Sequence, residues 1–407
     1  MRKQWLIILI LGALSTISPF SIDMYLPGFP AIATDLATSI AQVQLSLTAY
    51  LVGIAAGQLL YGPLLDRFGR RTPLYAGLVV YLLASIGCTF TTSIEGLIAM
   101  RFLQALGGCA GMVASQALVR DLFPVNKIAQ AFSSITLVIA VSPMIAPTVG
   151  GYVSAAYGWQ SVFVVLTILT ALILISVYFF LPEGKRADDT LSLSPQAVLN
   201  NFFTVLSQRQ FLIYALAGGI ATAAPFAYIA GSSNVFINIH HFTERQYGWI
   251  FAFIAIAIIG STQFNYTLLQ RFTSQQLTRF ALIYQTTVGL TLVLGTQYGW
   301  FGKYALIGML FLFLLGQGLT GPNSTALSLA PFSRLAGSAA ALLGSFRMAI
   351  GGIVTASVSF FHNNTAVPMV GVMVSCSVIG LTILTIGNRA VRVHPAADEA
   401  KKEQALI

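Results

Sequence analysis

Apolar stretches of about twenty residues recur along the whole chain, separated by short segments that carry charge, proline, asparagine or glycine. An α-helix rises 1.5 Å per residue, so ~20 apolar residues are enough to cross the ~30 Å hydrocarbon core of a bilayer. A membrane barrel would instead show weakly alternating segments of ~10 residues. The pattern predicts about twelve spanning helices, at roughly 5–27, 41–63, 72–92, 95–119, 127–153, 159–182, 211–236, 247–268, 278–298, 303–330, 336–361 and 365–388.

The first stretch, "MRKQWLIILILGALSTISPFSIDMYLPGFPAIA", has two features of a secretory signal, namely Arg2 with Lys3 ahead of an apolar run and the small residues of "AIA". The run is long for a signal core, Asp23 interrupts it, and similar stretches follow along the rest of the chain. We therefore interpret it as the first spanning helix.

Composition supports an all-α integral membrane protein. Of the 407 residues, 56% are hydrophobic and 8% are charged, against about 25% charged in soluble domains. Mean hydropathy is +0.81. With the N-terminus in the cytoplasm, seventeen Lys and Arg residues fall on the cytoplasmic side and only Arg245 and Lys303 fall outside. This asymmetry predicts an inner-membrane protein with both termini cytoplasmic, and it accounts for the net charge of +9 without nucleic acid.

The longest hydrophilic segment, "EGKRADDTLSLSPQ" at 183–196, follows the sixth predicted span. Leu-Leu-x-Arg-Phe occurs at 64–68 and again at 268–272, after the second and the eighth span. We predict a six-helix half at 1–182, a cytoplasmic linker with a short surface helix after Pro195 at 183–208, a second half at 209–392 and a tail at 393–407. Two halves with an internal repeat are typical of secondary transporters whose substrate site lies near the bilayer midplane.

Several motifs make this plan more specific. They are "SIDMYLPGFP" (21–30), "GPLLDRFGRR" (62–71), "RFLQALGG" (101–108), "VRDLFP" (119–124), "SPMIAPTVGG" (142–151) and "GSAAALLGSFRMAIGGIV" (337–354). With these motifs the chain resembles the bicyclomycin-resistance (Bcr/CflA) subfamily of drug:proton antiporters in the major facilitator superfamily. The resemblance implies twelve transmembrane helices in two pseudo-symmetric six-helix halves. It also implies export of small amphipathic drugs by alternating access, driven by the proton gradient without a cofactor, and we expect a monomer.

The loop after the second span carries the charges that would form a cytoplasmic latch. Gly62 and Gly69 would permit a tight turn that other residues would strain. The resemblance implies that this loop and the end of the fourth span form a charge cluster that breaks during the transport cycle; its residues are Gly62, Asp66, Arg67, Gly69, Arg70, Arg71 and Asp121. The alternative is that the arginines only anchor the chain at the cytoplasmic surface. If the latch exists, Asp66→Asn should fold normally and export poorly, and normal export by that variant would exclude it.

The fifth span contains Pro143, Pro147, Gly150 and Gly151. Proline removes a helical hydrogen bond and glycine lets backbones approach, so we expect a kinked and closely packed helix. A purely structural kink would explain these residues equally well. The resemblance implies the antiporter motif of exporters.

Glycines also recur on one face of the second span, at Gly53 and Gly57, and of the eleventh, at Gly337, Gly344 and Gly351. Small residues on one helical face mark close helix contact. The resemblance implies that these two helices face one another across the two halves as sliding surfaces.

Asp23 and Arg101 are the candidates for proton coupling. The fourth span carries Arg101, Gln104, Gly108, Gly111 and Ser115 on one face, which must point at protein or water because lipid would penalise the guanidinium. At 1.5 Å per residue, Asp23 lies about 6 Å and Arg101 about 9 Å below the outer boundary. Burial favours a neutral carboxyl and a nearby arginine favours its ionised form, so such a site can load and release a proton. Alternatively, Asp23 reaches the periplasm and Arg101 is structural.

The substrate cavity is the least constrained prediction. Pro225 interrupts the seventh span and "GQGLTGPNST" (316–325) interrupts the tenth, and broken helices expose backbone groups that can line a cavity. Arg347 in the eleventh span would contact a polar or anionic part of a substrate or bond to backbone carbonyls. The expected lining is Phe20, Tyr25, Gln104, Phe226, Tyr228, Asn323 and Arg347, although aromatic residues in membrane helices more often serve packing.

Other classes of protein lack support in the sequence. Cys88, Cys109 and Cys376 are isolated within apolar spans, and no metal-ligand spacing occurs, so we expect no metal site. The chain has no HExxH, GxSxG or GxxxxGK[ST] motif, which argues against a membrane-embedded enzyme and a nucleotide-driven pump. A proton-coupled metabolite transporter of the same superfamily remains the alternative, because fold alone does not decide substrate or direction.

Overall fold

A computed structural model describes residues 2–184, 195–332 and 335–387, and within these residues the chain forms only helices and the turns that join them. The predicted tail at 393–407 and residues 185–194 of the predicted linker lie outside the described residues. The elements are α1 (Arg2–Asp23), η1 (Leu26–Gly28), α2 (Phe29–Asp35), α3 (Ile40–Arg67), α4 (Arg71–Phe90), α5 (Ile94–Leu122), α6 (Val125–Tyr157), α7 (Gln160–Phe180), α8 (Pro195–Leu206), α9 (Arg209–Ala221), α10 (Ala224–Ser233), η2 (Asn234–Ile239), α11 (Glu244–Leu268), α12 (Ser274–Gln297), α13 (Lys303–Leu315), α14 (Gln317–Leu329), α15 (Ala336–Phe360) and α16 (Val367–Gly387).

The predicted spans correspond to these helices. Eleven helical segments in the described residues are long and apolar enough to cross a membrane. The predicted fifth span corresponds to α6, a helix of 33 residues that is not among those eleven. Polar residues mark several helix starts: the side chain of Ser39 accepts a hydrogen bond from the Gln42 backbone, and Ser93 accepts one from Gly96. Such caps satisfy the free N–H groups of a first turn.

Three predicted spans are broken in the structure. The first ends as an α-helix at Asp23 and continues through the 3₁₀ turn η1 into α2, with Pro27 inside that turn. The seventh is divided into α9, α10 and a π-helical segment η2, and Pro225 lies in the first turn of α10, where its missing N–H costs nothing. The tenth is divided into α13 and α14 at Gly316. The breaks predicted near Pro225 and in 316–325 are therefore observed.

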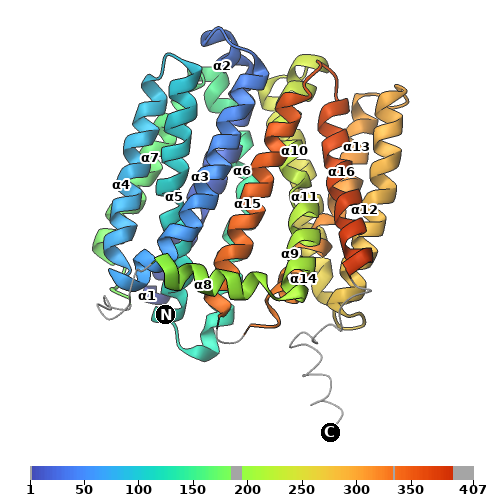
Figure 1. Cartoon of the computed structure of the whole chain (residues 1–407). Helices are drawn as coiled ribbons and strands as arrows, with labels where there is room; N and C mark the ends of the chain where they lie inside the picture. The colour runs from blue at the N-terminus through green and yellow to red at the C-terminus, as the bar shows by residue number, and fades with distance from the viewer. Residues whose placement is uncertain (1, 185–194, 333–334, 388–407) are drawn as a thin grey trace. The chain divides into compact units, whose positions relative to one another are not determined.

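Contacts divide the chain into two compact units. The first comprises Met1–Ser194 together with Ser233–Ala252, and the second comprises Pro195–Ser232 together with Phe253–Ile407. In the first unit α5 packs against α1, α3 and α4, while α6 packs against α1, and α7 against α4 (Figure 1). The second unit thus lacks residues 233–252, which lie within the predicted second half. The predicted boundaries at 182 and 209 remain a prediction.

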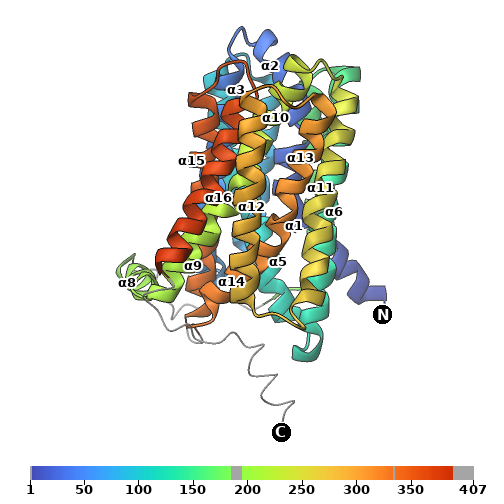
Figure 2. The same ribbon diagram turned by 90° about the vertical axis from the view of Figure 1, so that its right-hand side faces the viewer.

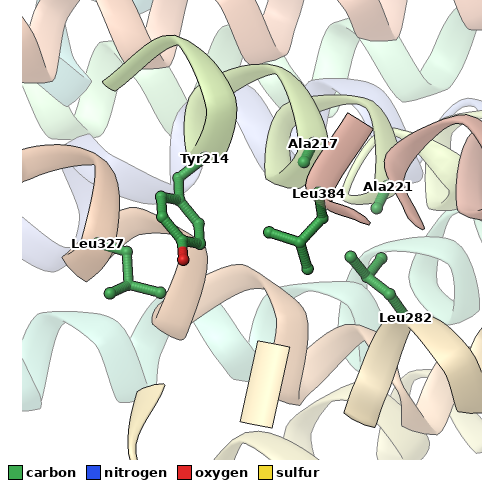
Figure 3. Packing of buried hydrophobic residues seen from close by; sticks show 6 residues of the cluster. All are labelled: Tyr214, Ala217, Ala221, Leu282, Leu327 and Leu384. Atoms are coloured by element: carbon green, nitrogen blue, oxygen red, sulfur yellow. The ribbon is translucent and has the colours of Figure 1, made fainter. Parts of the chain in front are cut away.

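The second unit is built around α9. This helix packs against α14 and α16, and α16 also packs against α12, which lies beside it in Figure 2. Side chains from four helices meet in a buried cluster (Figure 3), which consists of Tyr214, Ala217, Ala221, Leu282, Leu327 and Leu384. The alanines of α9 allow the neighbouring helices to approach closely, which is how helices associate where surrounding lipid is as apolar as the side chains.

The surface helix predicted after Pro195 is α8. It contacts α9 and α15, and Figure 1 shows it running across the direction of these long helices. It is the only part of the predicted linker, together with residues 183–184 and 207–208, that lies within the described residues.

Candidate functional site

Arg101 of α5 is the largest fully buried side chain in the described residues, with an exposed fraction of 0%. Its guanidinium carbon lies 4.4 Å from the ring centroid of Tyr25 and 4.1 Å from that of Tyr50. Nη1 donates a hydrogen bond of 2.5 Å to Oε1 of Gln104, and Nη2 donates one of 2.9 Å to the carbonyl oxygen of Ser21. Two tyrosine rings and two oxygen atoms therefore contact this cation, and the ring centroid of Phe163 lies 5.8 Å from its guanidinium carbon. We call Arg101, Tyr25, Tyr50, Gln104 and Ser21 the arginine cage.

The end of α1 explains why Arg101 binds the Ser21 carbonyl. Ser21 is among the last four residues of α1, whose carbonyl groups lack partners within the helix. A cation at a helix C-terminus is also favoured by the helix dipole. Arg101 thus satisfies a carbonyl in the last turn of α1, just before the chain enters η1.

Residues of the cage form further hydrogen bonds with side chains around it. Nε2 of Gln104 donates to Oγ of Ser85 at 2.8 Å. Oγ of Ser21 and the hydroxyl of Tyr81 are 2.5 Å apart, and the hydroxyls of Tyr25 and Ser46 also form a hydrogen bond. These partners come from α1, α3 and α4, so four helices fix the position of Arg101.

Asp23 lies at the end of α1, two residues after Ser21, with an exposed fraction of 4%. It is the only acidic side chain among the buried residues of the described chain. Within the described residues, Asp23 forms no ion pair with Arg101, whose Nε is buried without a hydrogen-bond partner. The structure therefore places the two predicted proton-coupling residues at the same end of α1, with Arg101 bonded to the backbone rather than to the carboxyl.

The helix α6 passes directly beside Asp23. A Cβ atom added to Gly150 would lie 1.8 Å from the carbonyl oxygen of Met24, so only glycine allows this approach. Pro143 and Pro147 lie inside α6, which runs as one helix through both. The close packing expected of this motif is thus observed at the residue that follows Asp23.

The opposite side of α6 contacts the start of α11. A Cβ atom on Gly151 would lie 2.6 Å from the carbonyl oxygen of Glu244. The Thr148 hydroxyl donates to the carbonyl oxygen of Gly248 at 3.3 Å, and a Cβ on Gly248 would lie 2.8 Å from Cα of Thr148. Small residues of α6 therefore let its backbone contact both Met24, just after α1, and the start of α11.

The predicted charge cluster forms around Arg70, in the loop between α3 and α4. Arg70 donates from Nη1 to Asp66 at 2.7 Å and from Nε to Asp121 of α5 at 2.8 Å, and its exposed fraction is 8%. Burial acts to lower the pKa of Arg70, but the hydrogen bonds to Asp121 and Asp66 outweigh it and raise the pKa above its ordinary value. Arg71 donates from Nη2 to the carbonyl oxygen of Leu181. The cation that joins both carboxylates is thus Arg70, one of the three arginines expected in the cluster.

The two glycines of this loop have different roles. Gly69 has φ = 78°, a left-handed conformation that glycine adopts without strain, and it directs Arg70 back toward Asp66. Gly62 lies inside α3, and an added Cβ would meet nothing within 4 Å. The expectation that Gly62 belongs to the turn was wrong, because α3 continues to Arg67.

In the second unit, Arg347 of α15 binds α14. Nη2 lies 2.8 Å from Oγ1 of Thr325, and 3.4 Å from both Oγ of Ser324 and the carbonyl oxygen of Gly321. Arg347 is partly buried, and within the described residues it forms no ion pair. The break predicted in the tenth span supplies all three partners.

The other predicted cavity residues do not gather into one described pocket. Phe20 and Phe226 are partly buried, whereas Tyr25 and Tyr228 are buried. Asn323 donates from Nδ2 to Oδ1 of Asn265 at 2.6 Å and is 1% exposed, so it joins α14 to α11. Phe20, Tyr25 and Gln104 belong to the first unit and the rest to the second, and a shared cavity remains a prediction.

Metal ligands do not cluster in the described residues, where no group of three or more His, Cys, Asp or Glu side chains could hold an ion. Cys88, Cys109 and Cys376 are buried free thiols.

A family model described as the Major Facilitator Superfamily matches residues 11–356. The chain belongs to the Major Facilitator Superfamily. A bicyclomycin resistance protein homolog of Haemophilus influenzae is 33% identical over 380 residues, covering 93% of this chain and 95% of the relative. A chloramphenicol resistance protein of Pseudomonas aeruginosa is 28% identical over 387 residues, covering 93% of this chain and 88% of the relative. These relatives confirm the resemblance to the bicyclomycin-resistance subfamily.

The fold of this major facilitator protein is also found in solved structures. The crystal structure of a bacterial homolog of the human lysosomal transporter Spinster, described as inward-facing and occupied, matches with a TM-score of 0.77 and 14% identity. The match covers 97% of this chain and 100% of the other. The predicted major facilitator fold of twelve helices in two halves is therefore confirmed, and the chain is a multi-pass membrane protein whose relatives are transporters.

Sequence reasoning missed Tyr50 and Ser46, although a signal for them exists. Ser46, Tyr50, Gly53 and Gly57 are spaced by four, three and four residues, so they share one helical face. On the same stripe, Tyr50 belongs to the arginine cage and Ser46 forms a hydrogen bond with Tyr25 of the cage.

The partner expected for that glycine stripe was wrong. A Cβ on Gly53 would lie 2.7 Å from the carbonyl oxygen of Phe102, and one on Gly57 would lie 2.7 Å from Cβ of Cys109. Both glycines therefore face α5 within the first unit. Close approach lets Tyr50 of α3 reach Arg101 of α5.

Proposed function

We propose that the protein is a proton-coupled multidrug exporter, which expels small amphipathic antibiotics across the inner membrane of a bacterium by alternating access. Its match to a bicyclomycin resistance protein homolog over nearly the full length of both chains supports this class of substrate. The observation that carries the coupling is the position of Asp23, the buried acid of the described residues, at the end of the helix that Arg101 holds.

The proton site would work by competition for Arg101. In the structure the guanidinium binds the Ser21 carbonyl and its Nε forms no hydrogen bond, and we assign this arrangement to the protonated state of Asp23. A deprotonated Asp23 would be a stronger acceptor, because hydrogen bonds between charged groups are roughly twice as strong as neutral ones. Loss of the proton would therefore draw Arg101 and the end of α1 together and change the packing at Met24.

Contacts of α6 would transmit this change in packing at Met24 to other helices. Gly150 contacts the carbonyl of Met24, and Gly151 contacts that of Glu244, in backbone contacts too close for any side chain between them. A shift at the end of α1 would therefore displace α6 and the start of α11. Proton movement at Asp23 would thus bias the state of the whole transporter.

The remaining parts of the proposal concern orientation, the source of free energy, assembly and the contact with the drug. Both termini and the Arg70 cluster lie on the cytoplasmic side, so Asp23 lies toward the periplasm, where it takes up protons. The proton gradient supplies the free energy and no cofactor is required. The chain acts as a monomer in the bilayer, and Arg347 contacts a polar part of the drug.

The proposal is tested by drug-driven proton flux in inverted membrane vesicles that carry an imposed pH gradient, followed with a pH-sensitive dye. Bicyclomycin and chloramphenicol are the first drugs to add. We expect each exported drug to dissipate part of the gradient in vesicles with the protein and not in empty vesicles. No response to any drug, with a response to a metabolite instead, would favour the metabolite transporter of the same superfamily.

Two aspartate variants complete this experiment. Asp23→Asn keeps the side-chain volume and removes the titratable group, so drug-driven proton movement should stop. Asp35→Asn is the matched control, because Asp35 is exposed at the end of α2, where it accepts hydrogen bonds from Trp159 and Gln160. Coupled movement that persists in Asp23→Asn would place the proton site elsewhere.

A further inference from the structure

A pocket of about 350 Å³ lies between α11, α12 and the junction of α13 with α14. This volume is within the range of small-molecule pockets, about 300–1,000 Å³. Its lining includes Gly260, Phe264, Phe280, Tyr284, Gly316 and Leu319. All lie in the second unit, and Figure 2 shows α11, α12 and α13 on the side facing the viewer.

The mouth of the pocket continues the lipid-facing surface of these helices. Phe264 and Phe280 are each 59% exposed. Neighbouring side chains on the same helices are also large, apolar and exposed, among them Phe253, Ile256, Ile283 and Leu290. In a spanning helix such side chains face hydrocarbon. The pocket therefore opens into the bilayer.

The depth of the pocket in the membrane favours a lipid acyl chain, and not a headgroup, as its ligand. Gly316 is thirteen residues after the start of α13 at Lys303, so it lies about 20 Å along a path that spans the membrane. The polar groups in the lining are engaged: the Tyr284 hydroxyl donates to the carbonyl oxygen of Leu312 at 2.9 Å, and that of Ser261 donates to Ala257 at 2.7 Å. The walls thus present hydrocarbon at the level of the acyl chains.

We propose that this pocket binds one acyl chain of a bilayer phospholipid, and that the chain stabilises the junction of α13 and α14. Gly316 at the junction packs against Gln285, since a Cβ there would lie 2.3 Å from Cγ of Gln285. Beyond the junction, α14 carries Ser324 and Thr325, which bind Arg347. An acyl chain in the pocket therefore supports, from the lipid side, the helix that holds Arg347. This inference depends on the membrane setting and not on the identity of the transported drug.

The test is photolabelling in proteoliposomes made with a phosphatidylethanolamine that carries a diazirine in the middle of one acyl chain. Labelled peptides are mapped by mass spectrometry. We expect label to concentrate on α11 near Gly260 and at the junction near Gly316, well above other lipid-facing helices. Label spread evenly over all exposed helix faces would overturn the proposal.

Gly260→Phe gives the matched variant, because an added Cβ at Gly260 meets nothing within 4 Å and the ring can fill the pocket. Gly308→Phe is the control, since Gly308 is also exposed and open but lies outside the lining. Labelling at the junction should fall severalfold in the first and stay unchanged in the second. Labelling that an exported drug displaces would show that the pocket holds drug instead of lipid. The distribution of label on the wild-type protein is enough to support or overturn the proposal, so the test remains valid even if a variant folds poorly.

Discussion

Arg101 and Arg347 are the two cations that the sequence places inside spanning segments, and their surroundings differ. Arg101 is fully buried, its guanidinium carbon lies 4.4 Å from the ring centroid of Tyr25 and 4.1 Å from that of Tyr50, and it binds the end of the helix that carries Asp23. Arg347 is partly buried and bound by hydroxyl and carbonyl oxygens of one broken helix. A cation that four helices hold at the end of the helix that carries an acid suits proton coupling. A partly exposed cation with hydroxyl partners can instead exchange those partners for a ligand.

The largest effect should come from Arg101→Lys. Lysine keeps the charge but has no planar guanidinium to stack between the rings or to reach Gln104 and Ser21 together. Hydrogen bonds to a charged group contribute about 1.5–3 kcal/mol each, so we expect drug-driven proton flux to fall by more than ~10-fold. Flux near the wild-type value in inverted vesicles would show that the geometry of the cage is unimportant.

Tyr50 tests the stacking alone. Tyr50→Phe keeps the ring over Arg101 and should export at close to the normal rate. Tyr50→Leu removes it, and a buried cation–π contact is worth about 2 kcal/mol, so export should fall by about 10–30-fold. Equal export by the two variants, measured as initial rates of drug uptake into inverted vesicles, would mean that Tyr50 only fills space.

Arg347→Ala should have a smaller effect that depends on the drug. Export of drugs with acidic or strongly accepting groups should fall severalfold, mainly through weaker apparent affinity, because uniform binding affects KM more than the transport step. Drug-independent proton leak should not change. Normal rate and affinity for every drug tested would remove Arg347 from the substrate site.

The smallest effects should come from the supporting hydroxyls. Ser85→Ala removes the acceptor of Gln104, and Thr325→Val removes the nearest oxygen of Arg347. A buried donor left without a partner costs about 1–3 kcal/mol. We expect Ser85→Ala to weaken proton coupling with every drug and Thr325→Val to change only the ranking of drugs. If instead Ser85→Ala changed only the ranking of drugs and Thr325→Val weakened proton coupling with every drug, the roles given to Arg101 and Arg347 would be contradicted.

Sequence reasoning predicted the spans, the breaks near Pro225 and in 316–325, and the common depth of Asp23 and Arg101. These features depend on local composition and on the rise per residue, which the sequence contains. It did not predict Tyr50 over Arg101, because this contact depends on how α3 is rotated against α5. Gly53 and Gly57 indicated that another helix packs closely against α3, but they did not indicate which helix it is.

The charge cluster shows a similar limit. Arg67, Arg70 and Arg71 are all near Asp66 in sequence, and only the left-handed conformation of Gly69 turns Arg70 toward both carboxylates. Composition could place these charges at the membrane surface, but it could not show which arginine bonds to both Asp66 and Asp121.

The central proposal is that Asp23 carries the proton that is exchanged for drug, so we expect binding of a drug to release this proton. The most direct measurement is proton release from the purified protein in weakly buffered detergent solution on addition of an exported drug, with binding followed separately by calorimetry. The account predicts release by the wild type and by Asp35→Asn, and binding without release by Asp23→Asn. Release by Asp23→Asn equal to that of the wild type would contradict it.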